Sequence, residues 1–599
     1  MLKKRKYKRA YFTIHNMKRL DVFLVAVFTM TALLMARLGV LMIVKSDEYS
    51  KKAIAIQERE RSIKAPRGKI YDRNGVCIAG NKPVCSISVI HNQITEPEKV
   101  ISVLSEKLSI DESEVRKKVE KYSSREKIKS NVDKTIADEI REMNLDGVMV
   151  DEDYKRYYPY SALASKVIGF TGADNQGIVG LEVMYDETLM GQDGSINTLT
   201  TARGIEIENA AETRIEPIAG NNLVVSLDVN IQQYVEQAAM QVLEKKQAKR
   251  VCIIVMNPQN GEIYALADVP EYDLNNPFTL NYELEEGEEV TQDMLNQMWR
   301  CFCTNDTYEP GSTFKIITAT SAFEEGVVSV DDSFYCPGYR IVEDRRIKCH
   351  KVVGHGAETF KQGIMNSCNP VFMDIGARVG AADFYKNMEK LGLFEKTGID
   401  LPGEANSIFH KLENVGPVEL ATMSFGQSFQ ITPFQLMRAV SAVINGGTLV
   451  TPHLGMYVTD ENDHIIETLE YEAEENVIDK ETSETMKTLL EAVVTEGTGH
   501  KAYVEGFRIG GKTATSEKFP RSSNKYISSF IGFAPADNPQ VLTLILIDEP
   551  EGVYYGGTIA APVVGEIYNN ILPYLGIEKE DTEVKEDSVE TVYFEDTVY

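Results

Sequence analysis

The sequence predicts an α+β protein of more than one domain, on three observations. At 599 residues the chain is too long for a single compact core. Strand-like segments at residues 223–227, 251–256 and 262–266 are matched near the C-terminus by segments at 526–533 and 541–547. Helical patterns fill the residues between, so we expect an antiparallel sheet that joins both ends of a domain, with a helical subdomain between them.

An apolar run near the N-terminus predicts a membrane anchor. Residues 22–44 carry one charge, Arg37, and as a helix would be about 34 Å long, enough for a hydrocarbon core of about 30 Å. The first twenty residues hold eight Lys and Arg and no acid, which predicts a cytoplasmic N-terminus and an extracytoplasmic remainder. A cleaved signal peptide is the alternative. The length of the run and the lack of a small-residue cleavage site directly after it favour an uncleaved, single-pass anchor.

Charge and composition divide the remainder of the chain. The net charge is -27, and beyond the basic head the chain is more acidic still, which argues against nucleic acid as a partner. Residues from about 96 to 145 are rich in Lys and Glu with apolar residues at helical spacing, which predicts surface helices. The expected domains are a basic tail (1–20), the anchor (21–45), a pedestal (46–217), the main domain (218–576) and a flexible acidic tail (577–599).

Three short strings, in this order, suggest acyl-transfer chemistry. In the first, Ser312-Thr313-Phe314-Lys315, the segment Pro310-Gly311 precedes a helix-compatible run, which would place Ser312 at a helix N-terminus. Lys315 would then lie one turn on, on the same face. A serine hydroxyl needs a neighbouring base to become a nucleophile, and a desolvated lysine can be that base. Alone, such a string occurs by chance in many helices.

The other two strings supply polar groups of the kinds that acyl transfer needs. The second is Ser367-Cys368-Asn369, in a loop, where a hydroxyl can relay protons and an amide can hold a substrate. The third, Lys512-Thr513, follows two glycines, as at a strand edge that a substrate can approach. There the lysine can attract a carboxylate and the threonine can hydrogen-bond to it. Each string by itself is ordinary surface sequence.

Together the three strings resemble the S-x-x-K, S-x-N and K-T-G set of the penicillin-binding proteins. Flanking segments make the resemblance specific to class B members, the monofunctional peptidoglycan D,D-transpeptidases, and it runs from the anchor to about residue 576. No stretch resembles the glycosyltransferase module of class A members. The supporting segments are residues 67–75 (RGKIYDRNG), 308–315 (YEPGSTFK), 398–404 (GIDLPGE), 432–435 (TPFQ) and 496–499 (EGTG).

The resemblance implies a fold, a reaction and site residues. The fold would be a transpeptidase domain like that of penicillin-binding proteins and serine β-lactamases, after a transmembrane helix and an elongated α+β pedestal or dimerisation domain. Ser312 would attack the penultimate D-Ala of a stem peptide with Lys315 as base, and β-lactams would acylate it in the same way. The remaining implied site residues are Ser367 and Asn369 for proton transfer and positioning, and Lys512, Thr513, Ala514 and Thr515 for substrate binding.

The resemblance also implies partners and leaves alternatives open. Catalysis would need no cofactor. Lipid II and its stem peptides would be substrates, and a polytopic glycosyltransferase of the SEDS class would be a partner, with other elongation, division or spore-cortex proteins. A D,D-carboxypeptidase or β-lactam-hydrolysing relative is one alternative function, and a non-catalytic β-lactam-binding scaffold is another. The six polar residues of the three strings argue against the scaffold.

The chain departs from the family pattern in two places. Ala514 stands where the family usually has glycine, which predicts slower acylation by bulky β-lactams. Cysteines also replace the usual residues ahead of the Ser312 string, and a cysteine and a histidine stand ahead of the segment 354–356 (GHG) where the family often has Cys-Trp. These thiol and imidazole groups suggest a tetrahedral Zn²⁺ site. The alternative is a set of buried free cysteines with a surface histidine. The predicted zinc ligands are Cys301, Cys303, Cys349 and His350, with Cys336 and Asp306 in reserve, while Cys368 is ordinary for the family.

Overall fold

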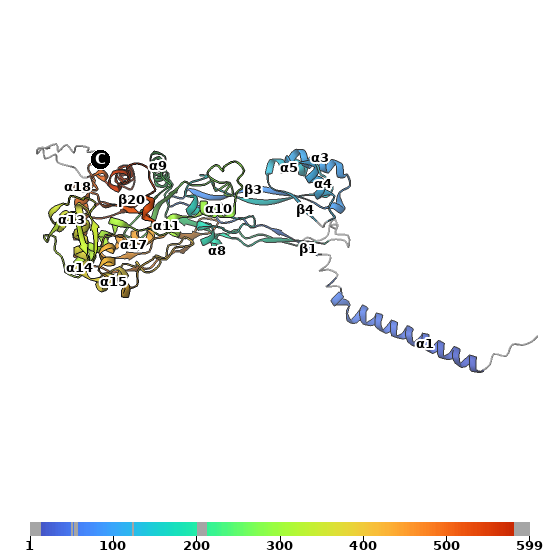
Figure 1. Cartoon of the computed structure of the whole chain (residues 1–599). Coiled ribbons are helices and arrows are strands. Elements are labelled where there is room, and N and C mark those ends of the chain that lie inside the picture. Colours follow the sequence, from blue (N-terminus) through green and yellow to red (C-terminus); the bar gives the residue numbers. More distant parts are fainter. Residues whose placement is uncertain (1–13, 50–51, 53–57, 123–124, 200–212, 580–599) are drawn as a thin grey trace, which may run out of the picture. The chain divides into compact units, whose positions relative to one another are not determined.

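The computed structural model describes residues 14–49, 52, 58–122, 125–199 and 213–579 (Figure 1). The first thirteen residues of the predicted basic tail and residues 580–599 of the predicted acidic tail lie outside the described residues. The chain forms two compact units. The smaller unit takes residues 1–64, 83–154 and 193–218, and the larger unit takes residues 65–82, 155–192 and 219–599. Two segments of the predicted pedestal therefore belong to the larger unit, because strand β2 (Ile70–Tyr71) pairs with β8 (Asn222–Val225).

The smaller unit begins with a long apolar helix. Helix α1 (Ile14–Gly39) continues through a π-helical turn (Val40–Val44). Within the described residues, Leu20–Val44 is long and apolar enough to cross a membrane, which agrees with a single-pass anchor. Its other elements form a three-stranded sheet and a small α/β layer: β1 (Glu58–Ile63), β6 (Gly194–Leu199), β7 (Thr213–Ile215), β3 (Cys77–Val89), β4 (Glu126–Asp133), β5 (Val148–Tyr157), α3 (Pro97–Leu108), α4 (Glu112–Val119) and α5 (Lys134–Glu142).

One part of the small α/β layer differs from the sequence prediction. Surface helices were predicted within residues 96–145, where α3, α4 and α5 lie, but 126–133 form β4 between α4 and α5. In β4, Ile128 and Val132 are buried and the charged residues point outward, which suits a half-buried strand. The charged composition of this segment also fits a helix. Pairing with β3 favours the strand, because it provides hydrogen-bond partners for the backbone of β4.

The larger unit is built on a five-stranded antiparallel sheet, in the order β10-β9-β21-β20-β19. This confirms the predicted joining of the two ends of the domain. The apolar faces of the strands are covered by α9 and α20 on one side and by the helical subdomain on the other. The strands and these two helices are β9 (Arg250–Met256), β10 (Ile263–Val269), β19 (Gly510–Glu517), β20 (Tyr526–Ala534), β21 (Val541–Asp548), α9 (Val229–Lys246) and α20 (Ala561–Tyr574).

The helical subdomain is centred on α12, which lies against α14, α15, α17 and α18. Its elements in chain order are α10 (Gln292–Trp299), α11 (Phe302–Asn305), the 3₁₀ turn η3 (Gly311–Phe314), α12 (Lys315–Glu324), β11 (Ser333–Cys336), β12 (Tyr339–Val342), β13 (Arg345–Lys348), β14 (Gly356–Thr359), α13 (Phe360–Met365), α14 (Asn369–Val379), α15 (Ala381–Lys390), η4 (Leu412–Asn414), α16 (Pro417–Met423), α17 (Pro433–Ile444) and α18 (Lys480–Thr495).

The remaining elements of the larger unit connect and close these layers. They are α6 (Ser165–Ile168), α7 (Gly180–Met184), α8 (Asp186–Leu189), β15 (Leu449–Val450), β16 (Gly455–Thr459), β17 (Ile465–Thr468), β18 (Ala473–Glu474), η5 (His500–Ala502), η6 (Arg521–Ser523) and α19 (Gly556–Ile559). Strands β17, β16, β8 and β2 pair in that order and continue into the first residues of β3.

Candidate active site

Lys315 is the centre of the candidate site. It is the first residue of α12, its side chain is fully buried, and its Nζ has three oxygen acceptors. Nζ donates to the Ser367 carbonyl oxygen at 2.6 Å, to Ser367 Oγ at 3.2 Å and to Asn369 Oδ1 at 2.8 Å. The first and second predicted strings are therefore in direct contact. Burial lowers the pKa of Lys315 to about 8, so the neutral amine is accessible near neutral pH.

Ser312 lies in the 3₁₀ turn that leads into α12, rather than at the N-terminus of the α-helix itself. Gly311, which precedes it, has a φ of 58°, a left-handed conformation that glycine adopts without strain. A methyl group added at Gly311 would also lie 2.3 Å from Ser516 Oγ on β19. Only glycine fits between the turn and the strand, and this close approach holds Ser312 beside β19.

The second string is held in a strained conformation. Ser367 has a φ of 53°, a left-handed conformation that costs energy for a residue with a side chain. Cys368 follows as the N-cap of α14, and Asn369 begins that helix instead of lying in a loop. The Asn369 amide donates to the Lys348 carbonyl oxygen at 3.2 Å, which orients its Oδ1 toward Lys315. In this conformation the side chains of Ser367 and Asn369 both point toward the Lys315 amine.

A second lysine lies next to the first. Lys512 is fully buried on β19, and its Nζ donates to the Thr513 carbonyl oxygen at 3.1 Å. Burial lowers its pKa well below the usual range, and the nearby charge of Lys315 lowers it further. The charge of Lys315 therefore favours the neutral form of Lys512. All three strings therefore converge on one buried site that contains both lysines.

Strand β19 ends the five-stranded sheet and pairs with β20 alone in that sheet, so one edge of it is free. Thr513 and Thr515 point to the same face, because strand side chains alternate. Thr513 Oγ1 donates to Thr498 Oγ1 at 3.1 Å, and Thr515 Oγ1 accepts from the Gly556 N–H at 3.1 Å. Sequence reasoning quoted the EGTG segment but missed the contact of Thr498 with Thr513. The paired hydroxyls suit a carboxylate bound along the strand.

The Ala514 side chain is buried and points toward the turn that carries Ser312, away from the threonines. A methyl group added at Gly311 would lie 3.6 Å from Ala514 Cβ. Behind the strand, a methyl group at Gly556 would lie 2.2 Å from the Ala514 carbonyl oxygen. Both faces of β19 are therefore closely packed at Ala514. The extra methyl group lies between the strand and the turn that carries Ser312, and so affects the spacing between them.

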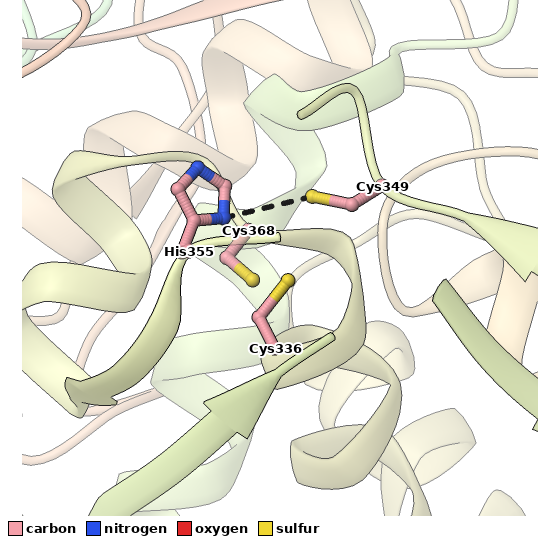
Figure 2. A group of neighbouring side chains, drawn as sticks. All are labelled: Cys336, Cys349, His355 and Cys368. Carbon is pink, nitrogen blue, oxygen red and sulfur yellow. Dashed lines mark hydrogen bonds between the residues drawn. The ribbon is translucent and has the colours of Figure 1, made fainter. Parts of the chain in front are cut away.

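The structure does not gather the four predicted zinc ligands. Of that set it places only Cys349 in a group whose ligand atoms all lie within 4.8 Å of one another, formed by Cys336, Cys349, His355 and Cys368. In Figure 2 these four side chains point toward a common centre, with His355 Nδ1 3.7 Å from Cys349 Sγ. His350 lies close by, with its Nδ1 3.8 Å from Cys349 Sγ. The reserve ligand Cys336 belongs to the group, and so does Cys368, which was expected to be ordinary.

The other two predicted ligands lie elsewhere in the fold. The Cys303 thiol contacts the thiols of Cys301 and Cys252, and Cys252 Sγ donates to Asp268 Oδ1 at 3.2 Å. Burial raises the pKa of Cys252 to about 12, which keeps this thiol protonated. The reserve ligand Asp306 instead forms a bidentate ion pair with Arg300, whose Nε and Nη2 each donate to one of its carboxylate oxygens at 2.9 Å. Cys301 and Cys303 are core residues here, as the alternative interpretation expected. All eight cysteines are free.

Comparison with known proteins decides the family. A model described as "Penicillin binding protein transpeptidase domain" matches residues 251–569, and one described as "Penicillin-binding Protein dimerisation domain" matches residues 62–225. This chain belongs to the class B penicillin-binding proteins. It is accordingly a serine-type D,D-transpeptidase, which confirms the predicted family, fold class and enzyme class. The family needs no cofactor for catalysis.

Relatives of this penicillin-binding protein span nearly its whole length. Stage V sporulation protein D of Bacillus subtilis is 38% identical over 92% of this chain and 84% of its own. The probable peptidoglycan D,D-transpeptidase PenA of Neisseria gonorrhoeae is 30% identical, with 93% of each chain covered. Among solved structures, penicillin binding protein 2X of Streptococcus thermophilus has a TM-score of 0.72 at 20% identity, covering 87% of this chain and 83% of its own. That likeness supports the fold.

Replacement of Ala514 with glycine is expected to speed acylation by cephalosporins about fivefold relative to benzylpenicillin. Removing a methyl group from a closely packed contact relieves about 1 kcal/mol, and each 1.36 kcal/mol is tenfold in rate. The second-order acylation rate constants of the two drug classes measure this. The matched control is Ala265→Gly, a buried alanine on β10. An unchanged or lower cephalosporin rate in the Ala514 variant contradicts the prediction.

Proposed function

We propose that this protein crosslinks peptidoglycan through an acyl-enzyme on Ser312. Ser312 Oγ attacks the carbonyl carbon of the penultimate D-Ala of a stem peptide, and neutral Lys315 takes the hydroxyl proton. The C–N bond then breaks, and the terminal D-Ala leaves as an amine that receives a proton through Ser367. An acceptor amine from a second stem peptide attacks the ester, forms the new amide and releases Ser312. β-Lactams acylate Ser312 by the same first step.

The substrate would be held by β19 and the turn before α12. Thr513 and Thr515 bind the terminal carboxylate, and the charge of that carboxylate favours the protonated form of Lys512 behind them. The backbone N–H groups of Ser312 and of Thr515 form the oxyanion hole, a contribution that is commonly the largest in acyl transfer. Asn369 positions both the substrate amide and Lys315. Ala514 sets the distance between the two oxyanion donors.

The observation that carries the mechanism is the Lys315 amine, which is buried, surrounded by Ser367 and Asn369, and lowered in pKa. Ammonium Lys315 has a proton for each of its three acceptors. Once neutral it has a lone pair for the proton of Ser312, and Ser367 Oγ can become a donor. This arrangement passes one proton from the nucleophile to the leaving group without a metal or an external base.

Defined lipid II and polymerised glycan strands test the function directly. The purified full-length chain in detergent is expected to form crosslinked peptide dimers and to bind fluorescent penicillin, and Ser312→Ala abolishes both. Release of D-Ala without dimers would instead establish the carboxypeptidase alternative. If the protein binds penicillin but turns over no lipid II in the presence of a glycosyltransferase, it is the non-catalytic β-lactam-binding scaffold.

The membrane topology and partners extend the proposal. Positive charge before the α1 helix supports a cytoplasmic N-terminus with the catalytic unit outside. By analogy with the family, the partner is a SEDS-type glycosyltransferase in the elongation, division or spore-cortex machinery. The similarity to a stage V sporulation protein over 92% of the chain supports the last of these. A tagged copy followed through growth and sporulation tests the assignment, and a septal or lateral-wall pattern without forespore signal contradicts it.

We also propose that Cys336, Cys349, His355 and Cys368 bind a structural Zn²⁺ ion, in place of the set expected from the sequence. Three thiols and one imidazole are a usual donor set for structural zinc. With bonds of about 2.0–2.3 Å, ligand atoms on tetrahedral zinc lie about 3.3–3.8 Å apart, so the observed 4.8 Å limit requires only a small contraction. The group would tie β11, the loop between β13 and β14, and the start of α14 together.

The surroundings of the cluster fit a bound cation. Hydrogen bonding from Cys368 lowers the pKa of the Cys349 thiol to about 2, which favours a thiolate. Burial lowers the pKa of His355, which favours the neutral imidazole that metals bind. Glu358 Oε1 is buried without a hydrogen-bond partner 3.8 Å from His355 Nδ1, so a cation held by this group would lie near a carboxylate oxygen that needs compensation.

Metal analysis of the full-length protein tests the zinc site. One zinc per chain is expected after purification without chelator, or after titration with Zn²⁺ alone, and Cys336→Ser with Cys349→Ser is expected to remove it. Cys77→Ser is the matched control, since this half-buried thiol lies outside the cluster. Protein that retains Ser312 labelling but takes up no stoichiometric zinc at micromolar concentration overturns the site.

A further inference from the structure

The hairpin of β12 and β13 has one face on the protein and one face in solvent. Residues paired across an antiparallel hairpin share a face, and successive residues of a strand alternate between the two faces. Val342 and Ile347 pack against α14 and α16, so they belong to the inner face. The outer face is formed by the two pairs Tyr339 with Lys348 and Ile341 with Arg346.

The outer face is basic. Arg346 and Lys348 are exposed, and so is Lys351, which follows the hairpin. In the part of the chain that the structure describes, none of these three side chains forms an ion pair with a carboxylate. On the inner face, by contrast, Arg340 is paired with Asp374 of α14. The outer cations are therefore available to a ligand.

Two further features keep this face positively charged. The Arg346 guanidinium lies 3.8 Å from the centre of the Tyr339 ring, which holds it in place without cancelling its charge. The acids of the hairpin, Glu343 and Asp344, form its turn, at the end away from the Tyr339 pair. In a chain with a net charge of -27, this solvent-facing group of cations reverses the sign of the surface locally and favours an anionic ligand.

The hairpin begins beside the catalytic amine. The Lys348 carbonyl oxygen accepts a hydrogen bond from the Asn369 amide at 3.2 Å, and Asn369 Oδ1 accepts one from Lys315 Nζ at 2.8 Å. Cys336 and Cys349, which flank the hairpin, both belong to the cluster in Figure 2, so both of its ends are held. The outer face therefore starts next to Asn369 and runs away from the site.

This position suits the acceptor rather than the donor, if the proposed function holds. The donor would lie along β19, which contacts η3, α18 and α19, whereas the hairpin contacts α14 and α16. The two approach the Lys315 amine from different elements, so the hairpin stays open to a second stem peptide. An acceptor stem peptide carries the attacking amine and, on the neighbouring residue, the free α-carboxylate of a glutamate that is linked through its side chain.

We propose that the outer face of the β12–β13 hairpin is a subsite for the carboxylate of the acceptor stem peptide. The glutamate α-carboxylate forms ion pairs with Arg346 and Lys348, and the aliphatic part of the acceptor lies against Ile341, which is 64% exposed. This holds the acceptor amine beside the ester on Ser312. Arg346 and Lys348 are thus specificity residues for the acceptor and take no part in proton transfer.

Two acceptor peptides test this, both with a free side-chain amine, one with the glutamate α-carboxylate free and one with it converted to an amide. The donor is a stem pentapeptide whose own amine is acetylated, so that it cannot serve as acceptor. Crosslinked product formed by the full-length protein in detergent gives kcat and KM for each acceptor. The free carboxylate is expected to lower KM about fivefold, as one or two exposed ion pairs do, and the difference should shrink at high ionic strength.

Exchange of both cations separates recognition of charge from structure. Arg346→Gln with Lys348→Gln is expected to bring the ratio of the two KM values close to one, and Arg346→Glu with Lys348→Glu to make the amide the better acceptor. The matched control is Lys386→Gln with Lys390→Gln, two exposed lysines on α15, which should keep the ratio of the unaltered protein. Labelling of Ser312 by penicillin shows that each variant is folded.

Equal KM values for the two acceptors in the unaltered protein, with crosslinked product still formed, overturn the subsite and leave the proposed function standing. An unchanged ratio in the labelled hairpin variants overturns it as well, since the preference would then arise elsewhere. Absence of crosslinked product with either acceptor would instead contradict the proposed function.

Discussion

Replacement of Lys315 with methionine is expected to lower the rate constant for acylation by penicillin about 10²–10⁴-fold, the range for loss of a general base. Methionine nearly conserves the volume of the side chain, so the packing of α12 should survive. The amine that contacts Ser367 and Asn369 is lost, and no proton acceptor replaces it. Stopped-flow measurement with fluorescent penicillin gives the rate constant.

The pH dependence separates loss of the base from loss of structure. In the unaltered protein, acylation should rise as pH increases through about 8, because burial lowers the pKa of Lys315 to that value and only the neutral amine accepts a proton. In the methionine variant this rise should disappear. Lys386→Met, an exposed lysine on α15, should keep both rate and profile. A profile that is flat from pH 6 to 9 in the unaltered protein would contradict the assignment of the base.

Glu182→Gln is expected to destabilise the larger unit by about 3–5 kcal/mol, the range for breaking a buried ion pair. Glu182 is fully buried, and its two carboxylate oxygens each lie 2.6 Å from a guanidinium nitrogen, one of Arg67 and one of Arg156. The Tyr158 hydroxyl also donates to it, at 3.2 Å. The amide would leave the buried Arg156 without its carboxylate partner and Arg67 with Asp186 alone, 2.7 Å from its Nη1.

Thermal unfolding of the full-length protein in detergent measures this effect as a fall in the apparent melting temperature. The matched control is Glu187→Gln, which changes an exposed acid five residues further along the chain. Equal shifts in the two variants would mean that the buried pair contributes nothing specific. Because this network lies apart from the three strings, penicillin binding by the surviving folded fraction should persist.

Local sequence patterns were enough to predict most of the larger unit. The strands at 251–256, 526–533 and 541–547 and the helix that begins at Val229 have the predicted positions within a residue or two. These segments have strong periodicity and clear turn signals between them, so near neighbours determine their conformation. The prediction of surface helices within 96–145 missed β4, because pairing with β3 outweighed a charged, helix-like composition.

The catalytic strings and the zinc cluster show the opposite limits of sequence reasoning. Ser312, Lys315 and Lys512 were found because their order and flanking segments match a family. The zinc ligands were instead chosen where thiols and an imidazole replace the usual residues of the family, and that criterion does not tell which side chains meet in space. The fold instead brings Cys336 and Cys368 to Cys349 by packing β11 and α14 together, and it leaves Cys303 in contact with Cys252 of β9.

The sequence by itself determined the kinds of reactive group, their order along the chain, the apolar anchor and the strand and helix periods, since all of these depend on residues close together. Only the tertiary structure decided which groups meet. The Lys315 amine reaches Asn369 across 54 positions, and Arg67 reaches Glu182 across 115. Such contacts depend on how whole elements pack, and burial at those contacts is what shifts the pKa of Lys315 toward a working base.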